Sequence, residues 1–169
     1  MEDVATPQGL LAVEEYLELE ASSAITHEYV GGMLYALAGD SDRHNRIAGN
    51  TYIALRAAAR RTRCRVYMSD MRLRVGANFY YPDVMVACEE PETDNPTFRN
   101  DACVVVEVLS VSTESIDRRE KLLAYRELPT LQAYLIVHQD IRRVERFFHG
   151  EDAVWQRADR VKVPCRSRA

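Results

Sequence analysis

The sequence predicts a mixed α/β (α+β) fold in which helices flank a central β-sheet. β-rich segments both precede and follow the helical ones, which is the order found in mixed folds. The 169 residues suffice for one hydrophobic core but not for two ordinary domains. With 47% hydrophobic residues, 7 Gly and 6 Pro, the composition excludes disordered and collagen-like chains. We therefore expect a single domain over residues 1–155 and a basic, frayed tail over residues 156–169.

The chain carries no signal for membrane insertion or export. No apolar run reaches the roughly 20 residues that span a bilayer, and the N-terminus lacks the basic start and apolar stretch of a signal peptide. The net charge of −4 is uneven, because residues 1–29 contain seven acids and no Lys or Arg. The mildly basic remainder permits a polyanionic partner without requiring one. We expect a cytoplasmic protein with no membrane partner.

The first third of the chain contains two predicted helices and a hairpin. Apolar residues at helical spacing over residues 10–17 predict an acidic amphipathic helix. The pair Gly31-Gly32 supplies the positive φ that a two-residue turn needs, so residues 25–38 are predicted to form a β-hairpin. A Gly-Asp-Ser-Asp stretch then offers capping side chains to a helix predicted over residues 43–61.

Further β-rich segments fill the rest of the chain. They cover residues 64–68, 72–75, 80–87, 102–109, 131–137 and 143–148. Proline and acidic residues predict a loop over residues 89–101. A helix predicted over residues 112–127 begins at a Ser-Thr pair and stops before Pro129.

The four cysteines form no recognisable framework. The chain has neither a CxxC pair nor a His/Cys spacing typical of zinc sites. We expect core or incidental thiols at Cys64, Cys88, Cys103 and Cys165.

Two carboxylates stand in segments that are otherwise apolar. Glu107 interrupts the β-branched run over residues 104–109, which is typical of a strand covered on both faces. A buried carboxylate without a partner costs several kcal/mol, so Glu107 needs a proton, a cation or a metal. Asp83 follows Pro82 at the start of another apolar segment. If the two strands are neighbours, the carboxylates converge on a site for a hard divalent ion such as Mg²⁺. The alternative is that Asp83 caps a turn and Glu107 pairs with an arginine.

Lys121 stands out among the basic residues. Of 22 Lys and Arg residues, only Lys121 and Lys162 are lysines. A lysine near a metal or in a desolvated pocket can orient a water or act as a base, which arginine cannot do at working pH. In the predicted helix Lys121 shares a stripe with Ala124 and Leu128, which favours an inward orientation. The alternative is a surface ion pair with Asp117.

Together these residues resemble a known pattern. Pro82-Asp83 followed by Glu107 is similar to the metal-binding half of the PD-(D/E)xK nuclease superfamily. The pattern EVLS-x-ST-x3-D-x3-K-x3-Y, from Glu107 to Tyr125, resembles the Uma-type restriction endonuclease family of that superfamily. The similarity extends over residues 15–148 and includes the hairpin sequence HEYVGGMLYAL and the helix start HNRI.

The resemblance implies a restriction-endonuclease-like core and phosphodiester hydrolysis that depends on Mg²⁺ or Mn²⁺. It implies that Asp83 and Glu107 bind the metal, with the backbone carbonyl of Val108 as a further ligand. The superfamily motif has its lysine at the position of Leu109, and the family pattern assigns that catalytic role to Lys121. Glu28 is expected to be an additional catalytic acid near the metal. The alternative is that Glu28 is a hairpin residue that forms an ion pair with an arginine.

Nucleic-acid contacts are predicted on the helix that begins near residue 43. His44 can contact a phosphate or shuttle a proton, although a histidine in the first turn of a helix also makes local hydrogen bonds. Five arginines near and just beyond the end of the same helix form a candidate phosphate-binding patch: Arg56, Arg60, Arg61, Arg63 and Arg65. The alternative is that these arginines are only the solvated end of a helix.

We therefore expect a Mg²⁺-dependent endonuclease that acts on nucleic acid, with DNA as the expected substrate. We also expect a homodimer, since two copies can cut both strands of a duplex in one encounter. The main alternative is a catalytically inactive family member that serves as a nucleic-acid-binding or protein-interaction module. A small-molecule enzyme is disfavoured, because no phosphate-binding Gly loop or nucleophile–base motif is present.

Overall fold

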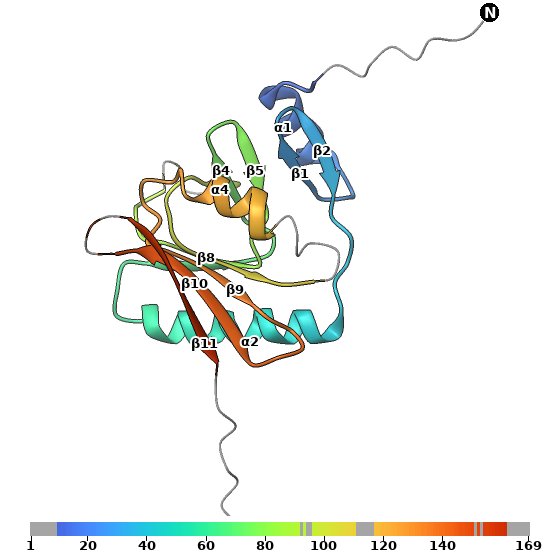
Figure 1. The fold of residues 1–169 in the computed structure, drawn as a ribbon. Coiled ribbons are helices and arrows are strands. Elements are labelled where there is room, and N and C mark those ends of the chain that lie inside the picture. Colours follow the sequence, from blue (N-terminus) through green and yellow to red (C-terminus); the bar gives the residue numbers. More distant parts are fainter. Residues whose placement is uncertain are drawn as a thin grey trace, which may run out of the picture.

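Two β-sheets with helices packed against them make up the fold (Figure 1). The computed structural model describes residues 10–91, 93, 96–110, 117–150, 152 and 154–161. The helical elements are α1 (Val13–Ser22), α2 (Asp42–Ala59), the π-helical turn η1 (Asp117–Lys121) and α4 (Leu122–Tyr125). The five-stranded sheet contains, in spatial order, β2 (Met33–Ala36), β1 (His27–Val30), β5 (Asn78–Tyr80), β4 (Arg72–Val75) and β7 (Phe98–Arg99). The six-stranded sheet contains β11 (Trp155–Val161), β10 (Arg143–His149), β9 (Ala133–Val137), β8 (Ala102–Val108), β6 (Val84–Ala87) and β3 (Arg65–Met68).

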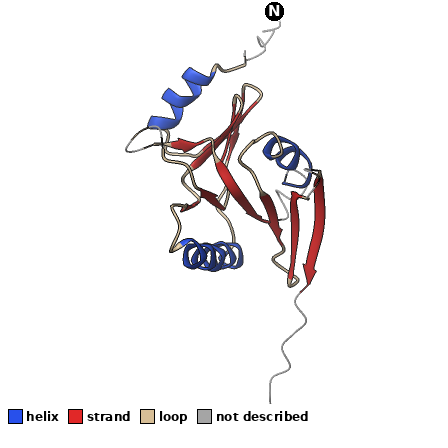
Figure 2. Ribbon diagram, turned by 90° about the vertical axis from the view of Figure 1, so that its left-hand side faces the viewer, coloured by secondary structure: helices blue, strands red, loops and turns tan. Residues whose placement is uncertain are grey.

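The six-stranded sheet is mixed, as the sequence predicts. β8 runs parallel to β9, whereas the remaining neighbours in this sheet are antiparallel. α2 lies on one face of the sheet, and η1 and α4 lie on the other (Figure 2). The β-branched run of β8 is therefore covered on both sides. Val106 packs in the cluster on the α2 side, and Val105 packs with Tyr125 and Tyr134 on the other side.

The five-stranded sheet carries the predicted N-terminal hairpin. Gly31 and Gly32 have φ of +58° and +86°, so the turn between β1 and β2 uses the backbone region that favours glycine. α1 packs on this sheet through Tyr16, which is 0% exposed and stacks on Tyr29 with 4.9 Å between ring centroids. The central element of the sheet, β5, continues through residues 81–83 into β6, which is one of the connections between the two sheets.

The C-terminal boundary of the predicted domain is wrong. Residues 155–161 form β11, which pairs with the whole length of β10, so the frayed tail cannot begin at residue 156. β11 is an edge strand, and its residues from Gln156 to Arg160 are exposed. An exposed edge strand needs no apolar alternation, so the period-two signal that identifies strands is missing from its sequence. Residues 162–169 lie outside the described part of the chain.

Two other element predictions need correction. The predicted loop over residues 89–101 contains the short strand β7, which pairs in parallel with β4. The helix predicted over residues 112–127 is, where described, the π-helical turn η1 followed by the single turn α4. Residues 111–116, where that helix was predicted to begin, lie outside the described residues. Within the described ranges, no helix combines the length and the apolar character needed to cross a bilayer.

The expectation of core or incidental thiols is wrong for two cysteines. Cys64 and Cys88 form a disulfide. The antiparallel register of β3 and β6 pairs Arg65 with Ala87, so these cysteines face each other just beyond the two strand ends. Sequence spacing did not reveal this, because strand pairing brings the two residues together. Cys103 has a free thiol, 3.4 Å from the Sγ atom of Cys88, and Cys165 lies outside the described residues.

Candidate active site

Asp83 and Glu107 lie next to each other across two strands of the six-stranded sheet. Val84 of β6 pairs with Val106 of β8 in antiparallel register, so Asp83, the residue before β6, comes opposite Glu107. Their side chains contact different elements: Asp83 contacts His44 of α2, and Glu107 contacts Lys121 and Tyr125 of η1 and α4. The Asp83 Oδ2 atom accepts a hydrogen bond of 2.7 Å from the backbone N–H of Val108. β6 and β8 are neighbours, as the prediction requires. That the carboxylates of Asp83 and Glu107 share one metal ion stays a prediction.

Lys121 reaches this group from η1 and is buried, with 5% of the residue exposed. Its Nζ atom lies 3.2 Å from Oε1 of Glu107 and 3.0 Å from Oε1 of Glu28. The ammonium group therefore joins two buried carboxylates. Lys121 therefore faces inward, as the stripe of the predicted helix favours. The side chain of Asp117 lies outside the described residues.

Glu28 brings the five-stranded sheet into the site. It belongs to β1, is 7% exposed, and its Oε1 atom accepts a hydrogen bond of 3.1 Å from the backbone N–H of Tyr81. Tyr81 lies in the connection from β5 to β6, two residues before Asp83. In the described residues the basic partner of Glu28 is Lys121 and not an arginine. The site is thus built where the two sheets meet.

Tyr125 is a site residue that the sequence reasoning did not identify. Its hydroxyl donates a hydrogen bond of 2.9 Å to Oε1 of Glu107, and the residue is 0% exposed. Burial raises the pKa of Tyr125 well above its ordinary value, and the charge of Glu107 raises it further, so the phenol stays protonated and donates. The ring is held edge-on between Tyr80 and Tyr134. A signal was present, because Tyr125 ends the K-x3-Y part of the family pattern.

His44 approaches Asp83 from the start of α2. The backbone N–H of His44 donates to the hydroxyl of the N-cap residue Ser41 at 3.2 Å. The ring places Nε2 3.2 Å from Oδ2 of Asp83, and Nδ1 3.5 Å from Oδ2 of Asp40. Burial lowers the pKa of His44, but the hydrogen bond and charge of Asp83, with the charge of Asp40, outweigh burial and raise it overall. Asp40 was missed, although it stands one helical turn before His44.

These side chains suit a divalent cation. Asp40, His44 and Asp83 each offer a ligand atom, and the three atoms lie within 4.8 Å of one another. Within the described part of the chain, the Oδ2 atom of Asp83 contacts both the ring of His44 and the backbone N–H of Val108. Carboxylate oxygens are the ligands that Mg²⁺ prefers, and imidazole is compatible with Mn²⁺ and similar ions. The donor set that the structure brings together therefore fits a hard or borderline metal ion.

The structure does not bring the predicted arginine patch to this site. Arg56 lies in the last turn of α2, and Arg60 and Arg61 follow the helix; all three are exposed. At about 1.5 Å per residue, Arg56 lies about 18 Å along the helix from His44. The other two members of the predicted patch are paired with acids: Arg63 with Glu89 at 3.3 Å and Arg65 with Glu90 at 3.2 Å.

Known structures and families define the class of protein. The crystal structure described as "a putative nuclease belonging to DUF820 from Anabaena variabilis" superposes with a TM-score of 0.74 and 15% sequence identity. The match covers 93% of this chain and 90% of that chain. The chain therefore has the fold of that structure, a mixed α+β fold as the sequence predicts.

The family follows from the sequence match. The Uma2 family model, described as "Putative restriction endonuclease", matches residues 13–162, and the chain belongs to this family. The family resemblance noted from the sequence is thereby confirmed.

Two proteins of Synechocystis sp. (strain PCC 6803) are similar in sequence over most of their length. The uncharacterized protein sll1609 is 35% identical over 156 residues, which is 90% of this chain and 88% of that protein. The uncharacterized protein slr1290 is 31% identical over 166 residues, which is 94% of this chain and 87% of that protein.

Proposed function

We propose that this protein is a metal-dependent endonuclease that hydrolyses phosphodiester bonds of nucleic acid, with DNA as its substrate. The observation that carries the proposal is the buried ammonium group of Lys121 between Glu28 and Glu107, with Asp83 on the adjacent strand. A lysine among carboxylates is the combination that phosphodiester hydrolysis needs, since one group must orient water while others hold a cation. Membership of the Uma2 family supports the proposal.

The metal-binding residues in this proposal are Asp83 and Glu107, with the backbone carbonyl of Val108 as a further ligand. Asp40 and His44 offer a second set of donor atoms that shares Asp83. When bound, Mg²⁺ or Mn²⁺ neutralises charge on the phosphate and lowers the pKa of a bound water.

The protein's own residues position the reacting groups. Glu28 and Glu107 fix the side chain of Lys121, which as an ammonium group orients the attacking water and as a neutral amine can accept its proton. Tyr125 holds one oxygen of Glu107, and His44 holds one oxygen of Asp83. Each carboxylate is therefore oriented before substrate arrives, which reduces the reorganisation needed during the reaction.

The proposal includes contacts to a duplex and a second copy of the chain. His44 lies at the site and is proposed to contact a phosphate near the scissile bond. Arg56, Arg60 and Arg61 are proposed to contact phosphates farther along a duplex that follows α2. A homodimer would present two such sites to the two strands of one duplex. Light scattering at micromolar concentration tests the dimer, and a monomeric mass would leave only nicking of single strands.

A second candidate function rests on the ion pairs of Lys121. They already compensate part of the negative charge of Glu28 and Glu107 within the protein. This is expected of a family member that keeps the fold without catalysis and binds nucleic acid or protein. The two functions differ in metal binding and in cleavage.

The deciding experiment incubates the purified chain with supercoiled plasmid and with single-stranded DNA. Each substrate is incubated with Mg²⁺, with Mn²⁺ and with EDTA, and Glu107→Gln is the matched variant. The endonuclease proposal expects metal-dependent nicking or linearisation by the parent and none by the variant. Absence of cleavage by the parent under every metal condition, together with absence of Mn²⁺ binding by calorimetry, would favour the inactive module.

A further inference from the structure

A groove lies beside α2 on the six-stranded sheet. α2 packs on β3, β6 and β8, and Leu135 and Val137 of β9 belong to the same apolar cluster. Val144 and Arg146 of β10 pair with these two β9 residues, so they project from the same face of the sheet. Beyond β9, over β10 and β11, no helix covers this face within the described residues, and Arg146, Gln156 and Arg160 are exposed there.

The end of this groove nearest the β9–β10 turn is a pocket of about 910 Å³. Ile47 of α2 forms one wall, and the opposite wall comes from the β9–β10 turn with Val144 and Arg160. Its volume is within the range of ligand-binding pockets.

The pocket adjoins the candidate active site. β8 and β9 are parallel, so the β9–β10 turn lies at the same edge of the sheet as the end of β8, where Glu107 stands. Gln139 of this turn donates a hydrogen bond of 2.5 Å from its side-chain amide to the carbonyl of Leu109. Ser41, the N-cap of α2, donates to the side chain of Gln139 at 3.2 Å. A polymer with one phosphodiester beside Asp83 and His44, at the start of α2, can therefore continue into the pocket.

The pocket is lined with guanidinium groups. Arg142, Arg143 and Arg160 line it, against the single carboxylate of Asp140. Asp140 is itself paired with Arg43 at 2.6 Å. Arg142 and Arg160 are exposed, and neither forms an ion pair with another described residue. Guanidinium groups without a carboxylate partner on an accessible surface are suited to phosphate oxygens.

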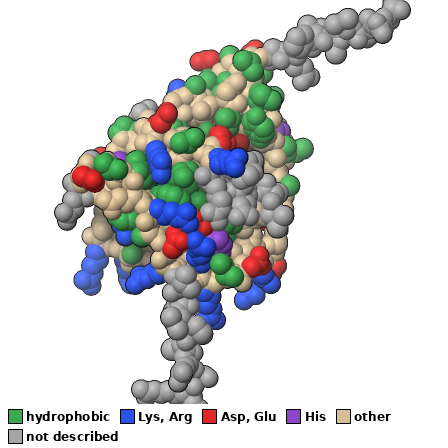
Figure 3. Space-filling view, in the orientation of Figure 1, with side chains coloured by type: hydrophobic (Ala, Val, Ile, Leu, Met, Phe, Trp, Pro, Cys, Tyr) green, Lys and Arg blue, Asp and Glu red, His purple; other side chains and the backbone are tan. Residues whose placement is uncertain are grey.

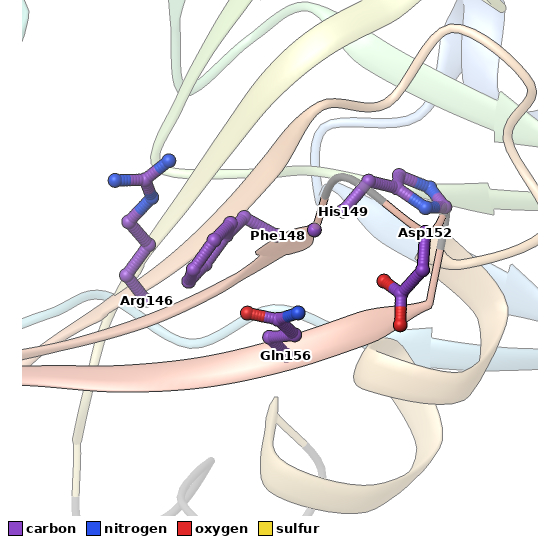
Figure 4. A pocket seen from close by; sticks show the side chains of 6 residues that line it. Arg146, Phe148, His149, Asp152 and Gln156 are labelled. Atoms are coloured by element: carbon purple, nitrogen blue, oxygen red, sulfur yellow. The ribbon is translucent and has the colours of Figure 1, made fainter.

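The groove continues along the β10–β11 hairpin. A second hollow of about 630 Å³ is lined by residues that include Arg146, Phe148 and Gln156, and extends to Asp152 in the hairpin loop (Figure 4). The Arg146 guanidinium lies 4.1 Å from the ring centroid of Phe148. An aromatic ring beside a guanidinium is a surface on which a nucleobase can stack. Figure 3 shows Lys and Arg side chains gathered over the region of β10 and β11 and along the edge where α2 runs.

We propose that this groove, between α2 and the β10–β11 hairpin, binds the sugar–phosphate backbone of the nucleic-acid strand that leaves the active site. Arg142 and Arg160 contact phosphates next to the scissile bond, and Arg146 with Phe148 receives the strand farther along. The inference rests on the proposed nuclease function and specifies the path of its substrate. It differs from the Arg56–Arg61 patch, which lies at the other end of α2.

The test measures DNA binding without cleavage. Fluorescence anisotropy in EDTA measures the affinity for a labelled 30-base single strand and for the matching duplex. Three proteins are compared: the parent, the groove variant Arg142→Gln/Arg160→Gln and the control variant Arg63→Gln/Arg65→Gln. The last variant removes the same charge from arginines that are already paired with Glu89 and Glu90. All four substituted side chains are exposed, so each variant is expected to fold.

The groove variant should bind DNA about tenfold more weakly than the parent. The slope of its log affinity against log salt concentration should correspond to about two fewer phosphate contacts. The control variant should bind as the parent does. Equal affinity of all three proteins, with cleavage by the parent intact, would overturn the groove and leave the nuclease function standing. No binding and no cleavage by the parent would overturn both. A change of mass by light scattering with unchanged DNA affinity would show that the groove holds a second copy of the chain, which also overturns the proposal.

Discussion

Lys121 contacts Glu107 from fourteen residues farther along the chain, with 3.2 Å between Nζ and Oε1. Two residues after Glu107, where the superfamily motif has its lysine, this chain has Leu109, which is 7% exposed and packs in the apolar core. The helical segment after β8 thus supplies the ammonium group that the strand does not.

Replacing Lys121 by Met should separate metal binding from cleavage. The variant leaves Glu28 and Glu107 buried without their shared cation, and loss of one partner of a buried ion pair costs about 3–5 kcal/mol. We expect the free energy of unfolding in EDTA to fall by about that amount, as measured by urea denaturation. Mn²⁺ should bind at least as tightly as in the parent, because the site is more negative, yet cleavage should be lost.

Lys121→Arg is the matched control for this variant. Arginine keeps the charge, so the loss of stability should be smaller, but it cannot give up a proton and cleavage should still be lost. If Lys121→Met cleaves DNA as fast as the parent, Lys121 is not the catalytic lysine.

Glu107→Gln should remove metal binding and cleavage together. The amide keeps the size of the side chain and can still accept the hydrogen bond of Tyr125, and Lys121 keeps its contact with Glu28. The lost group is the negative charge that a divalent ion needs. We expect Mn²⁺ affinity by calorimetry and plasmid cleavage to fall in parallel. The exposed Glu127→Gln should change neither, and a Glu107→Gln variant that binds Mn²⁺ like the parent would remove Glu107 from the ligand set.

Tyr125→Phe tests whether the phenol positions Glu107. The ring packing between Tyr80 and Tyr134 is kept, and only the hydroxyl that donates to Glu107 is removed. A hydrogen bond to a charged group contributes about 1.5–3 kcal/mol, so the free energy of unfolding should fall by that amount. If Tyr125 positions Glu107, kcat should also fall while DNA affinity in EDTA stays unchanged. A loss of stability with an unchanged kcat would show that the hydroxyl is only structural.

The predictable features are those that local chemistry determines. The turn at Gly31-Gly32 needs positive φ, the β-branched run around Glu107 needs cover on both faces, and both are found as predicted. Glu107 and Lys121 were identified because each breaks the pattern around it. An acid in an apolar strand and a lysine in an arginine-rich chain are visible without any structure.

The remaining features depend on contacts between distant segments. Tyr125 was missed because a buried tyrosine usually serves the core, and only its contact with Glu107 distinguishes it. The link from Asp40 through His44 to Asp83 depends on the packing of α2 against the sheet. The Cys64–Cys88 disulfide depends on the register of β3 with β6, which no spacing rule supplies.

The Cys64–Cys88 disulfide should make the stability of the protein depend on reductant. It closes a loop between residues that are 24 positions apart and should contribute about 2–4 kcal/mol to the free energy of unfolding. Urea denaturation of the parent with and without dithiothreitol measures this contribution. Burial raises the pKa of the Cys103 thiol, so this group should react slowly with iodoacetamide near neutral pH.

Two serine variants separate the disulfide from the neighbouring thiol. Cys103→Ser keeps the Cys64–Cys88 pair, so its stability should respond to dithiothreitol as the parent does. Cys88→Ser removes the pair. It also prevents a bond between Cys88 and Cys103, because the Sγ atoms of these two residues lie 3.4 Å apart in the folded chain. Its stability should therefore be independent of reductant. If the parent unfolds at the same urea concentration with and without dithiothreitol, there are two explanations. Either the bond does not form in the purified protein, or residual structure in the unfolded chain already restricts the segment between Cys64 and Cys88. A non-reducing peptide map distinguishes them by the absence or presence of the linked Cys64 and Cys88 peptides.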